Sequence, residues 1–372
     1  MKTIVVSAVN LKVGGTLTIL RGCLQYLSSL AETGKFRIVA LVYQKELALF
    51  PNIEYIEMQW PKKNWLYRLW CEYVTMKKIS KQLSPVYLWL SLHDATPNVV
   101  AERRVVYCHN SFPYYKWKLR EWWFAPKIVL FALFTKYIYR QNMDKNMYVI
   151  VQQEWMKKDF VHSFGLKAAS IIVAPPPVLP AQKIIASTET NTSGMGSYSF
   201  LFAAAPDSHK NFECICQATK LLIEQSEVRD FKVYITVKGN ENKYAKWLYR
   251  KWGKGISQLV FSGYLDKKTL YDYYGQCNCL IFPSKVETWG LPVTEFAAYD
   301  KPMLLADLPY AHETASGCHQ LAFFNPDDPQ ELAGQMKRLI QGEDDFLITA
   351  ATITIPDPVA RSWHELFDIL LT

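Results

Sequence analysis

The stretch Phe282-Pro-Ser-Lys-Val-Glu-Thr-Trp-Gly-Leu-Pro-Val-Thr-Glu295 joins a strand pattern to a helix pattern. It continues the apolar run Cys279–Phe282, which is typical of a buried strand. Pro292 suits the first turn of a helix, which we predict over Leu291–Ala298. Gly290, directly before that helix, lets the backbone approach a ligand without a Cβ in the way. Strand, glycine-containing loop and helix in this order predict one unit of a parallel α/β sheet.

The predicted helix start and two carboxylates beside it suit an anionic, hydroxyl-rich ligand. The unpaired N–H groups and positive dipole end of a helix N-terminus attract a diphosphate. A carboxylate in the loop, at Glu287, can bind sugar hydroxyls, and one in the first part of the helix, at Glu295, can hold ribose hydroxyls. The same spacing also fits a solvent-facing Glu287 and a Glu295 that only complements the helix dipole.

Short β-branched runs alternate with amphipathic helical stretches on both sides of this segment, which predicts two successive doubly wound domains. A chain of 372 residues is long enough for two cores. We expect a first domain over 1–180, a polar linker over 181–197, a second domain over 198–357 and a final helix over 358–372 that crosses back to the first. The predicted strands are Thr3–Val9, Phe36–Val42, Val86–Leu92, Val105–Cys108, Tyr148–Gln152, Ser199–Ala204, Lys232–Val237, Gln258–Phe261, Cys279–Phe282 and Met303–Ala306.

In such sheets ligands bind where loops leave the carboxyl ends of strands. Four of these loops carry polar or glycine-rich residues: 10–15, 109–113, 205–211 and 283–290. The strict Gly-x-Gly-x-x-Gly pattern is absent from the first, which argues against a nicotinamide-dependent oxidoreductase.

Charge is unevenly distributed along the chain, whose net charge is +8. Residues 1–180 hold 24 Lys and Arg against 11 Asp and Glu, a net +13, and the remainder carries −5. A basic half beside an acidic half indicates an anionic partner for the basic one; nucleic acid, a membrane surface and a phosphorylated substrate all qualify.

Eight cysteines form no Cys-x-x-Cys pair, which favours reduced, buried thiols in a cytoplasmic protein. No signal-peptide pattern follows Met1, and the apolar run Ile128–Phe134 is too short to span a bilayer. We therefore expect a cytoplasmic protein, and a peripheral position on the inner face of the plasma membrane is compatible with that expectation.

The glutamate pair, with seven residues between Glu287 and Glu295 around Trp289-Gly-Leu-Pro292, resembles the family 4 glycosyltransferases of the GT-B fold, of the retaining, bacterial surface-polysaccharide type. The resemblance continues through Asp307–Glu313 and Phe323–Leu332. It implies two Rossmann-like domains facing a central cleft. It also implies hexosyl transfer from a nucleoside diphosphate sugar to a hydroxyl of a glycan or lipid-linked acceptor, with the anomeric configuration retained and no metal or other cofactor required. The chain has no Asp-x-Asp motif, which fits metal independence.

The resemblance also assigns roles to residues of this chain. Glu287 and His109 would be catalytic, and the donor would be bound by Gly14, Gly15, Lys210, Tyr264, Trp289, Gly290, Leu291 and Glu295. An arginine that the family often carries upstream of the lysine is missing from Ala203–Pro206, so Lys238 or Lys285 would supply a second cation. Each of these residues also has an interpretation without a ligand. Lys210 could be a solvated lysine, Tyr264 could be ordinary packing, Gly14-Gly15 could only form a tight turn, and His109 could be structural.

Residues 114–140 interleave ten aromatic with six basic side chains. This mixture suits an anionic membrane surface. It could also bind nucleic acid, but no zinc finger or recognised RNA-binding signature accompanies it, so we expect no nucleic acid partner. A buried helix with a basic outer face is the remaining interpretation.

Two other functions stay open on the sequence alone. One is a non-catalytic GT-B protein that binds nucleotide or glycan, and the other is a GT-B sugar epimerase or phosphorylase.

Overall fold

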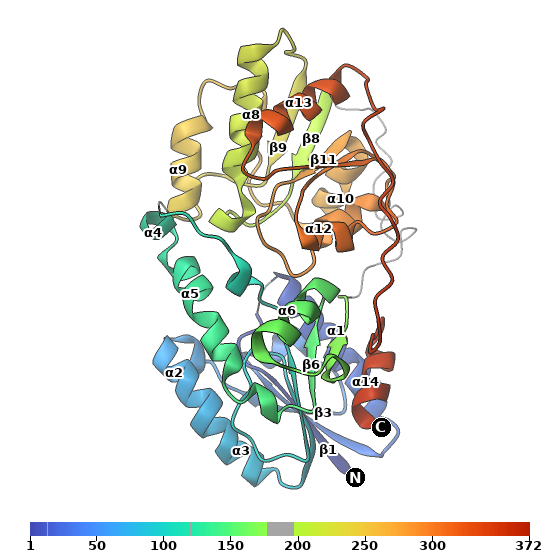
Figure 1. The fold of residues 1–372 in the computed structure, drawn as a ribbon. Helices are drawn as coiled ribbons and strands as arrows, with labels where there is room; N and C mark the ends of the chain where they lie inside the picture. Colours follow the sequence, from blue (N-terminus) through green and yellow to red (C-terminus); the bar gives the residue numbers. More distant parts are fainter. Residues whose placement is uncertain (13, 120, 177–196) are drawn as a thin grey trace. The chain divides into compact units, whose positions relative to one another are not determined.

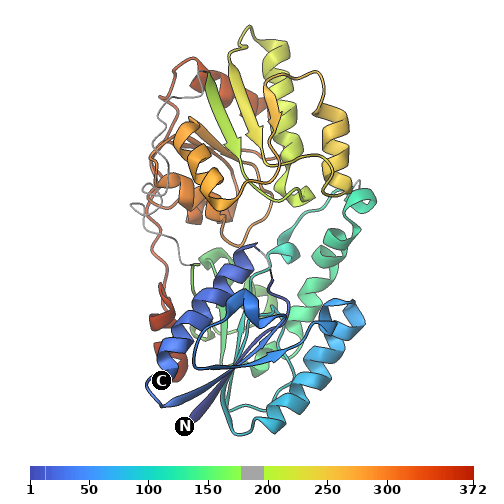
Figure 2. The same ribbon diagram turned by 180° about the vertical axis from the view of Figure 1, so that it is seen from behind.

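The computed structural model describes residues 1–12, 14–119, 121–176 and 197–372. These residues form two compact units, Met1–Asn110 with Phe134–Pro177 and Thr354–Thr372, and Ser111–Leu133 with Val178–Ile353. Each unit is a parallel sheet with helices on both faces (Figures 1 and 2). The predicted linker 181–197 lies almost wholly outside the described residues.

The first unit contains a seven-stranded sheet in the order β3-β2-β1-β4-β5-β6-β7. Central strand β4 is buried along its whole length, as expected for a parallel strand covered on both faces. The strands are β1 (Lys2–Ala8), β2 (Phe36–Val42), β3 (Ile53–Glu57), β4 (Val86–Ser91), β5 (Arg103–Tyr107), β6 (Tyr148–Val151) and β7 (Ile171–Val173). The α-helices that belong wholly to this unit are α1 (Gly14–Ala31), α2 (Trp65–Trp70), α3 (Met76–Gln82), α6 (Glu154–Phe164) and α14 (Trp363–Leu371).

The second unit contains a six-stranded sheet in the order β10-β9-β8-β11-β12-β13. Its strands are β8 (Tyr198–Phe202), β9 (Phe231–Ile235), β10 (Leu259–Phe261), β11 (Cys279–Phe282), β12 (Met303–Ala306) and β13 (Leu321–Phe324). Its α-helices are α4 (Glu121–Phe124), α8 (Phe212–Gln225), α9 (Lys243–Trp252), α10 (Lys267–Gln276), α11 (Leu291–Ala297), α12 (Pro309–Thr314) and α13 (Pro329–Ile340). Helix α5 (Pro126–Arg140) carries the chain from this unit back to the first.

All ten strands expected from the sequence are present, and the three that were missed lie at sheet edges. β3, β7 and β13 each pair with one named strand, and β7 and β13 add only a single isolated bridge on their other side. An edge strand needs fewer apolar side chains, and β3 accordingly alternates Ile with Glu and Tyr and has no fully buried residue. The sequence signal of β3 is therefore weaker than that of the central strands, whereas β7 and β13 are apolar but only three and four residues long.

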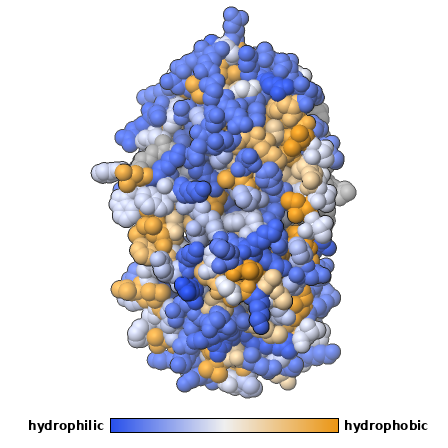
Figure 3. All heavy atoms as spheres, in the orientation of Figure 1, coloured by the Kyte–Doolittle hydropathy of each residue, from blue (hydrophilic) through white to orange (hydrophobic). Residues whose placement is uncertain are grey.

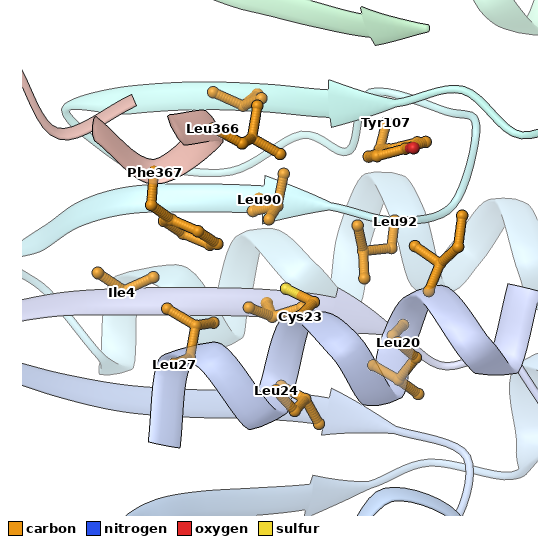
Figure 4. Packing of buried hydrophobic residues seen from close by; sticks show 14 of the residues in the cluster. Ile4, Leu20, Cys23, Leu24, Leu27, Leu90, Leu92, Tyr107, Leu366 and Phe367 are labelled. Carbon is orange, nitrogen blue, oxygen red and sulfur yellow. The ribbon is translucent and has the colours of Figure 1, made fainter. Parts of the chain in front are cut away.

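The core of the first unit is completed by the last helix. One face of the sheet is covered by α1 and α14, with Leu24, Leu90 and Phe367 among the buried contacts (Figure 4). Gly22 in α1 permits a close approach, because a Cβ there would lie 2.6 Å from Nε1 of Trp363. The opposite face is covered by Cys71, Met76 and neighbouring side chains.

The structure differs from two predicted boundaries. Residues 111–133, which we expected in the first domain, group with the second unit, because Phe124 packs on Tyr244 and Trp247 there. The final helix begins at Trp363 rather than at 358, because residues 358–360 extend along β7 with hydrogen bonds to Val173.

We expect Phe367→Ala to lower the free energy of unfolding by about 3–5 kcal/mol, because it empties a fully buried site in the first core. His364→Ala on the exposed side of the same helix should change it by less than about 0.5 kcal/mol. Urea unfolding of both variants measures the difference; equal effects would show that α14 is not part of this core.

Candidate functional site

The second unit brings Lys210 and Glu287 into contact. Lys210 ends the turn Ser208–Lys210 after β8, and Glu287 lies in the loop after β11. These strands are neighbours in the sheet and run parallel, so their following loops meet at one edge. Nζ of Lys210 donates to Oε1 of Glu287 at 2.5 Å, and the two side chains are 18% and 13% exposed. The pair is a half-buried cation and anion at the carboxyl end of the sheet.

The loop then turns through Gly290 into α11. Gly290 precedes the helix with φ 96°, a left-handed conformation that favours glycine, and a Cβ there would lie 3.3 Å from the Phe282 ring. Leu291 is the first residue of α11, and Pro292 follows it. Trp289 is held by its carbonyl, which accepts from the Thr314 hydroxyl, and its indole Nε1 is buried without a hydrogen bond to the described residues.

Glu295 lies one turn into α11 and faces two tyrosines. The hydroxyls of Tyr271 and Tyr274 lie 3.3 Å and 3.4 Å from its two oxygens. Burial raises the pKa of Glu295, and the charge of Lys267 and the two hydroxyls offset part of that rise. The carboxyl is therefore positioned by the protein rather than solvated, which the spacing in the sequence did not show.

Lys238 and Lys285, the two lysines that could supply a second positive charge beside Lys210, differ in their surroundings. Lys285 bonds Asp327 at 2.6 Å, and Lys118 bonds the same carboxylate at 2.7 Å. Burial acts to raise the pKa of Asp327, but these two lysines outweigh it and lower the pKa to about 2. Lys285 is thus engaged by an anion already, whereas Lys238 is exposed beside Gly263, the residue before Tyr264. Tyr264 itself is 88% exposed.

In the first unit, the predicted residues also follow strand ends. Gly14, with φ 65°, and Gly15 open α1 after β1, and no side chain or backbone atom outside their neighbours lies within 4 Å of a Cβ built at Gly14. His109 follows β5, and its ring stacks on Tyr107 with the ring centroids 4.5 Å apart. Burial lowers the pKa of His109 to about 3, and neither ring nitrogen makes a hydrogen bond of good geometry with the described residues. A neutral imidazole with two unused nitrogens can bind a hydroxyl as donor or acceptor.

Asp94 holds the loop that carries His109, a role that we did not predict from the sequence. Its carboxylate accepts the backbone N–H of His109, and it lies 3.5 Å from the Tyr139 hydroxyl. Burial raises the pKa of Asp94 to about 6, against the opposing effect of these hydrogen bonds. Its backbone has φ 68°, which is uncommon outside glycine. The signal in the sequence was the polar Ser-Leu-His-Asp at the end of a strand.

Each unit thus gathers its predicted residues at the carboxyl ends of its strands. Lys210, Glu287, Trp289, Gly290, Leu291 and Glu295 lie on the loops and helix after β8 and β11, and Tyr264 follows β10. Within the described residues, no three His, Cys, Asp or Glu side chains are grouped as a metal site would need.

Comparison with known proteins points to the same region. Residues 197–342 match the family model described as "Glycosyl transferases group 1". The serotype-specific mannosyltransferase WbdA of Escherichia coli is 27% identical over 145 residues, which is 38% of this chain. That alignment covers 17% of the relative's own length.

Solved structures match nearly the whole chain. Sucrose-phosphate synthase from Thermosynechococcus elongatus has a TM-score of 0.65 at 13% identity, covering 93% of this chain and 92% of the other. Anabaena Alr3699/HepE, in complex with UDP and glucose, has a TM-score of 0.63 at 13% identity over the same shares. The fold is GT-B. The fold class expected from the sequence is thereby confirmed.

The carboxyl of Asp94 should make stability depend on pH. Its pKa is raised in the folded protein, so the folded state binds this proton more tightly than the unfolded chain. The contribution is complete below the ordinary pKa of about 4 and is lost as pH rises through about 6. Between about pH 4.5 and 6.5, wild type should lose on the order of 2 kcal/mol more than Asp94→Asn, which cannot titrate. Urea unfolding at both pH values gives this difference; identical pH dependence in the two proteins would contradict the buried, raised carboxyl.

Proposed function

We propose that this chain transfers a hexosyl group from a nucleoside diphosphate sugar to an acceptor hydroxyl, with retention of the anomeric configuration. The observation that carries the proposal is the Lys210–Glu287 contact beside the start of α11. Both residues fall inside the segment that matches the glycosyl transferase model. The printed names of similar proteins, a mannosyltransferase and a protein in complex with UDP and glucose, support the same class of reaction.

The two members of the pair would have complementary tasks. Without donor, Lys210 and Glu287 neutralise each other. A diphosphate beside the lysine would take over the ammonium, which then stabilises charge on the departing nucleotide. The positive dipole end of α11 would attract the same phosphates, although Pro292 has no N–H and the N–H of Val293 already donates to the Gly290 carbonyl. Glu287, released from the lysine, would accept hydrogen bonds from sugar hydroxyls.

Glu295 and the surrounding aromatic residues suit the nucleoside. The Tyr271 and Tyr274 hydroxyls orient the Glu295 carboxyl, which leaves it able to accept from ribose hydroxyls. The exposed ring of Tyr264 offers a face on which a base could stack. His109, neutral and without hydrogen bonds of good geometry at its ring nitrogens, would bind a hydroxyl of the transferred sugar or of the acceptor.

We also infer an acceptor at a membrane, either a lipid-linked glycan or a growing surface polysaccharide. Within residues 114–140, Leu119, Trp122, Trp123, Phe134 and Tyr137 are exposed, whereas Phe124 and Tyr115 pack inside the second unit. The segment is thus partly core and partly exposed aromatic surface. Lys118 is already paired with Asp327, and residue 120 lies outside the described residues. A peripheral position at the inner face of the membrane would suit this surface. No helix among the described residues is long and apolar enough to cross a bilayer.

Glu287→Gln should lower turnover roughly 10²–10³-fold, the loss expected when one oriented contact to the reacting sugar is removed. Lys210→Met should lower turnover and weaken nucleotide binding together, and Glu295→Gln should mainly weaken nucleotide binding. Glu343→Gln, an exposed glutamate of the same unit, is the matched control. The donor is first identified by thermal shift with UDP- and GDP-sugars, because a ligand at about 100 times its Kd stabilises by about 2.7 kcal/mol. Full activity in Glu287→Gln would contradict the catalytic role of Glu287. Donor binding by the wild type without any transfer would favour a non-catalytic binding protein.

Chelator should leave the reaction rate nearly unchanged, since Lys210 and the α11 N-terminus would supply the positive charge at the diphosphate. Proton NMR of the product should show the donor's anomeric configuration. A rate abolished by chelator and restored by Mg²⁺ would refute the first expectation, and an inverted product the second.

A further inference from the structure

Helix α2 of the first unit carries its apolar side chains outward. Trp65, Leu66, Leu69 and Trp70 are 49%, 77%, 39% and 58% exposed. At 3.6 residues per turn these four positions share an arc of about 140° on the helix surface. Figure 3 shows the apolar side chains over α2 at the left edge of the first unit. A helix at the surface of a globular protein normally turns this stripe toward the core.

The inward side of α2 and of the π-helical turn that follows it, Cys71–Thr75, carries a buried ion pair. Arg68 donates from Nε to Oε1 of Glu72 at 2.7 Å, and Nδ1 of His93 lies 2.9 Å from the same oxygen. The backbone N–H of Val9 donates to Nε2 of His93 at 3.3 Å, which favours a proton on Nδ1. Nδ1 lies 2.9 Å from both Oε1 of Glu72 and Nη2 of Arg68. Burial acts to raise the pKa of Glu72, but Arg68 and His93 outweigh it and keep the carboxyl ionised.

This network fixes which way α2 faces. The side chains of Arg68, Glu72 and His93 are 12%, 2% and 0% exposed, so rotating the helix to bury its tryptophans would bring a buried ion pair into water and break the His93 contacts. The outward apolar face is therefore a feature that the fold maintains and not a loose segment.

Positive charge surrounds the exposed face. Between Gln59 and Ser84 the only acidic residue is Glu72, which is buried. Lys62 and Lys63 precede α2, and Lys77, Lys78 and Lys81 follow on α3; all five are exposed. Burial lowers the pKa of Lys62, and the nearby charges of Lys12 and Arg68 lower it further.

We propose that α2 and its flanking lysines bind the surface of an anionic phospholipid bilayer, with Trp65, Leu66 and Trp70 inserted at the headgroup level. Indole rings and leucines beside lysines on one helix are the composition of interfacial helices. A second copy of this chain is a poorer occupant. Exposed lysines flank the helix on both sides, so parallel and antiparallel pairing would each oppose like charges.

This surface is distinct from residues 114–140, and it does not depend on the proposed glycosyl transfer. It is tested by co-sedimentation with vesicles of phosphatidylcholine alone or of equal parts phosphatidylcholine and phosphatidylglycerol, with no nucleotide or acceptor present. Failure to bind would therefore leave the transfer proposal untouched.

Wild type should sediment with the anionic vesicles and hardly with the neutral ones. W65Q/L66Q/W70Q should bind anionic vesicles at least about tenfold more weakly, because three apolar side chains no longer enter the interface. K62Q/K63Q should bind anionic vesicles about 30-fold more weakly, because it removes two cations that are attracted to the anionic surface. The control L49Q/M147Q, which replaces exposed apolar side chains elsewhere in this unit, should match wild type.

Three results would overturn the proposal. They are absence of wild-type binding to anionic vesicles, unchanged binding of W65Q/L66Q/W70Q, and a wild-type dimer in sedimentation velocity that this variant abolishes. A further variant, L119Q/W122Q/W123Q, reports separately on the 114–140 segment. All substituted side chains are exposed, and circular dichroism melting curves check that each variant folds.

Discussion

The parallel pairing of β8 with β11 is the constraint on which the candidate site depends. Neighbouring parallel strands end at the same edge of a sheet, so the two loops that follow them must meet there. One loop brings a lysine and the other a glutamate, 77 residues apart in sequence. Gly290 then lets the second loop pass close to Phe282, and α11 begins four residues after Glu287. The pairing of β8 with β11 thus both sets the strand order and brings Lys210 to Glu287.

Much of this arrangement could be predicted from local sequence. Central strands such as Cys279–Phe282 are apolar throughout because both faces are covered, and Pro292 after Gly290 marks a helix start. The position of Lys210 before α8 likewise follows from a strand, a polar loop and an amphipathic helix in series. These signals are local, so one sequence suffices to read them, and the fold class inferred from them was correct.

What could not be predicted depends on partners distant in sequence. The sequence around Glu295 does not predict that Tyr271 and Tyr274 orient its carboxyl. The sequence around Lys285 does not predict that its ammonium donates to Asp327. The apolar spacing of residues 65–83 suits the helical segment that the structure has there, but it does not show which way that segment faces. That orientation is decided by His93, whose ring holds Glu72 from another loop. The roles of Glu287, His109 and the donor-binding residues remain proposals that rest on placement.

The order in which the two units alternate along the chain has a consequence for folding during synthesis. The core of the first unit contains Leu366, Phe367 and Leu370, so it cannot close until those residues have left the ribosome. The second unit has all its strands and the segment 111–133 by residue 353. A nascent chain should therefore hold a complete second unit while the first still exposes the apolar face of its sheet. Residues 354–372, which complete the first unit, thus follow the whole of the second unit in sequence.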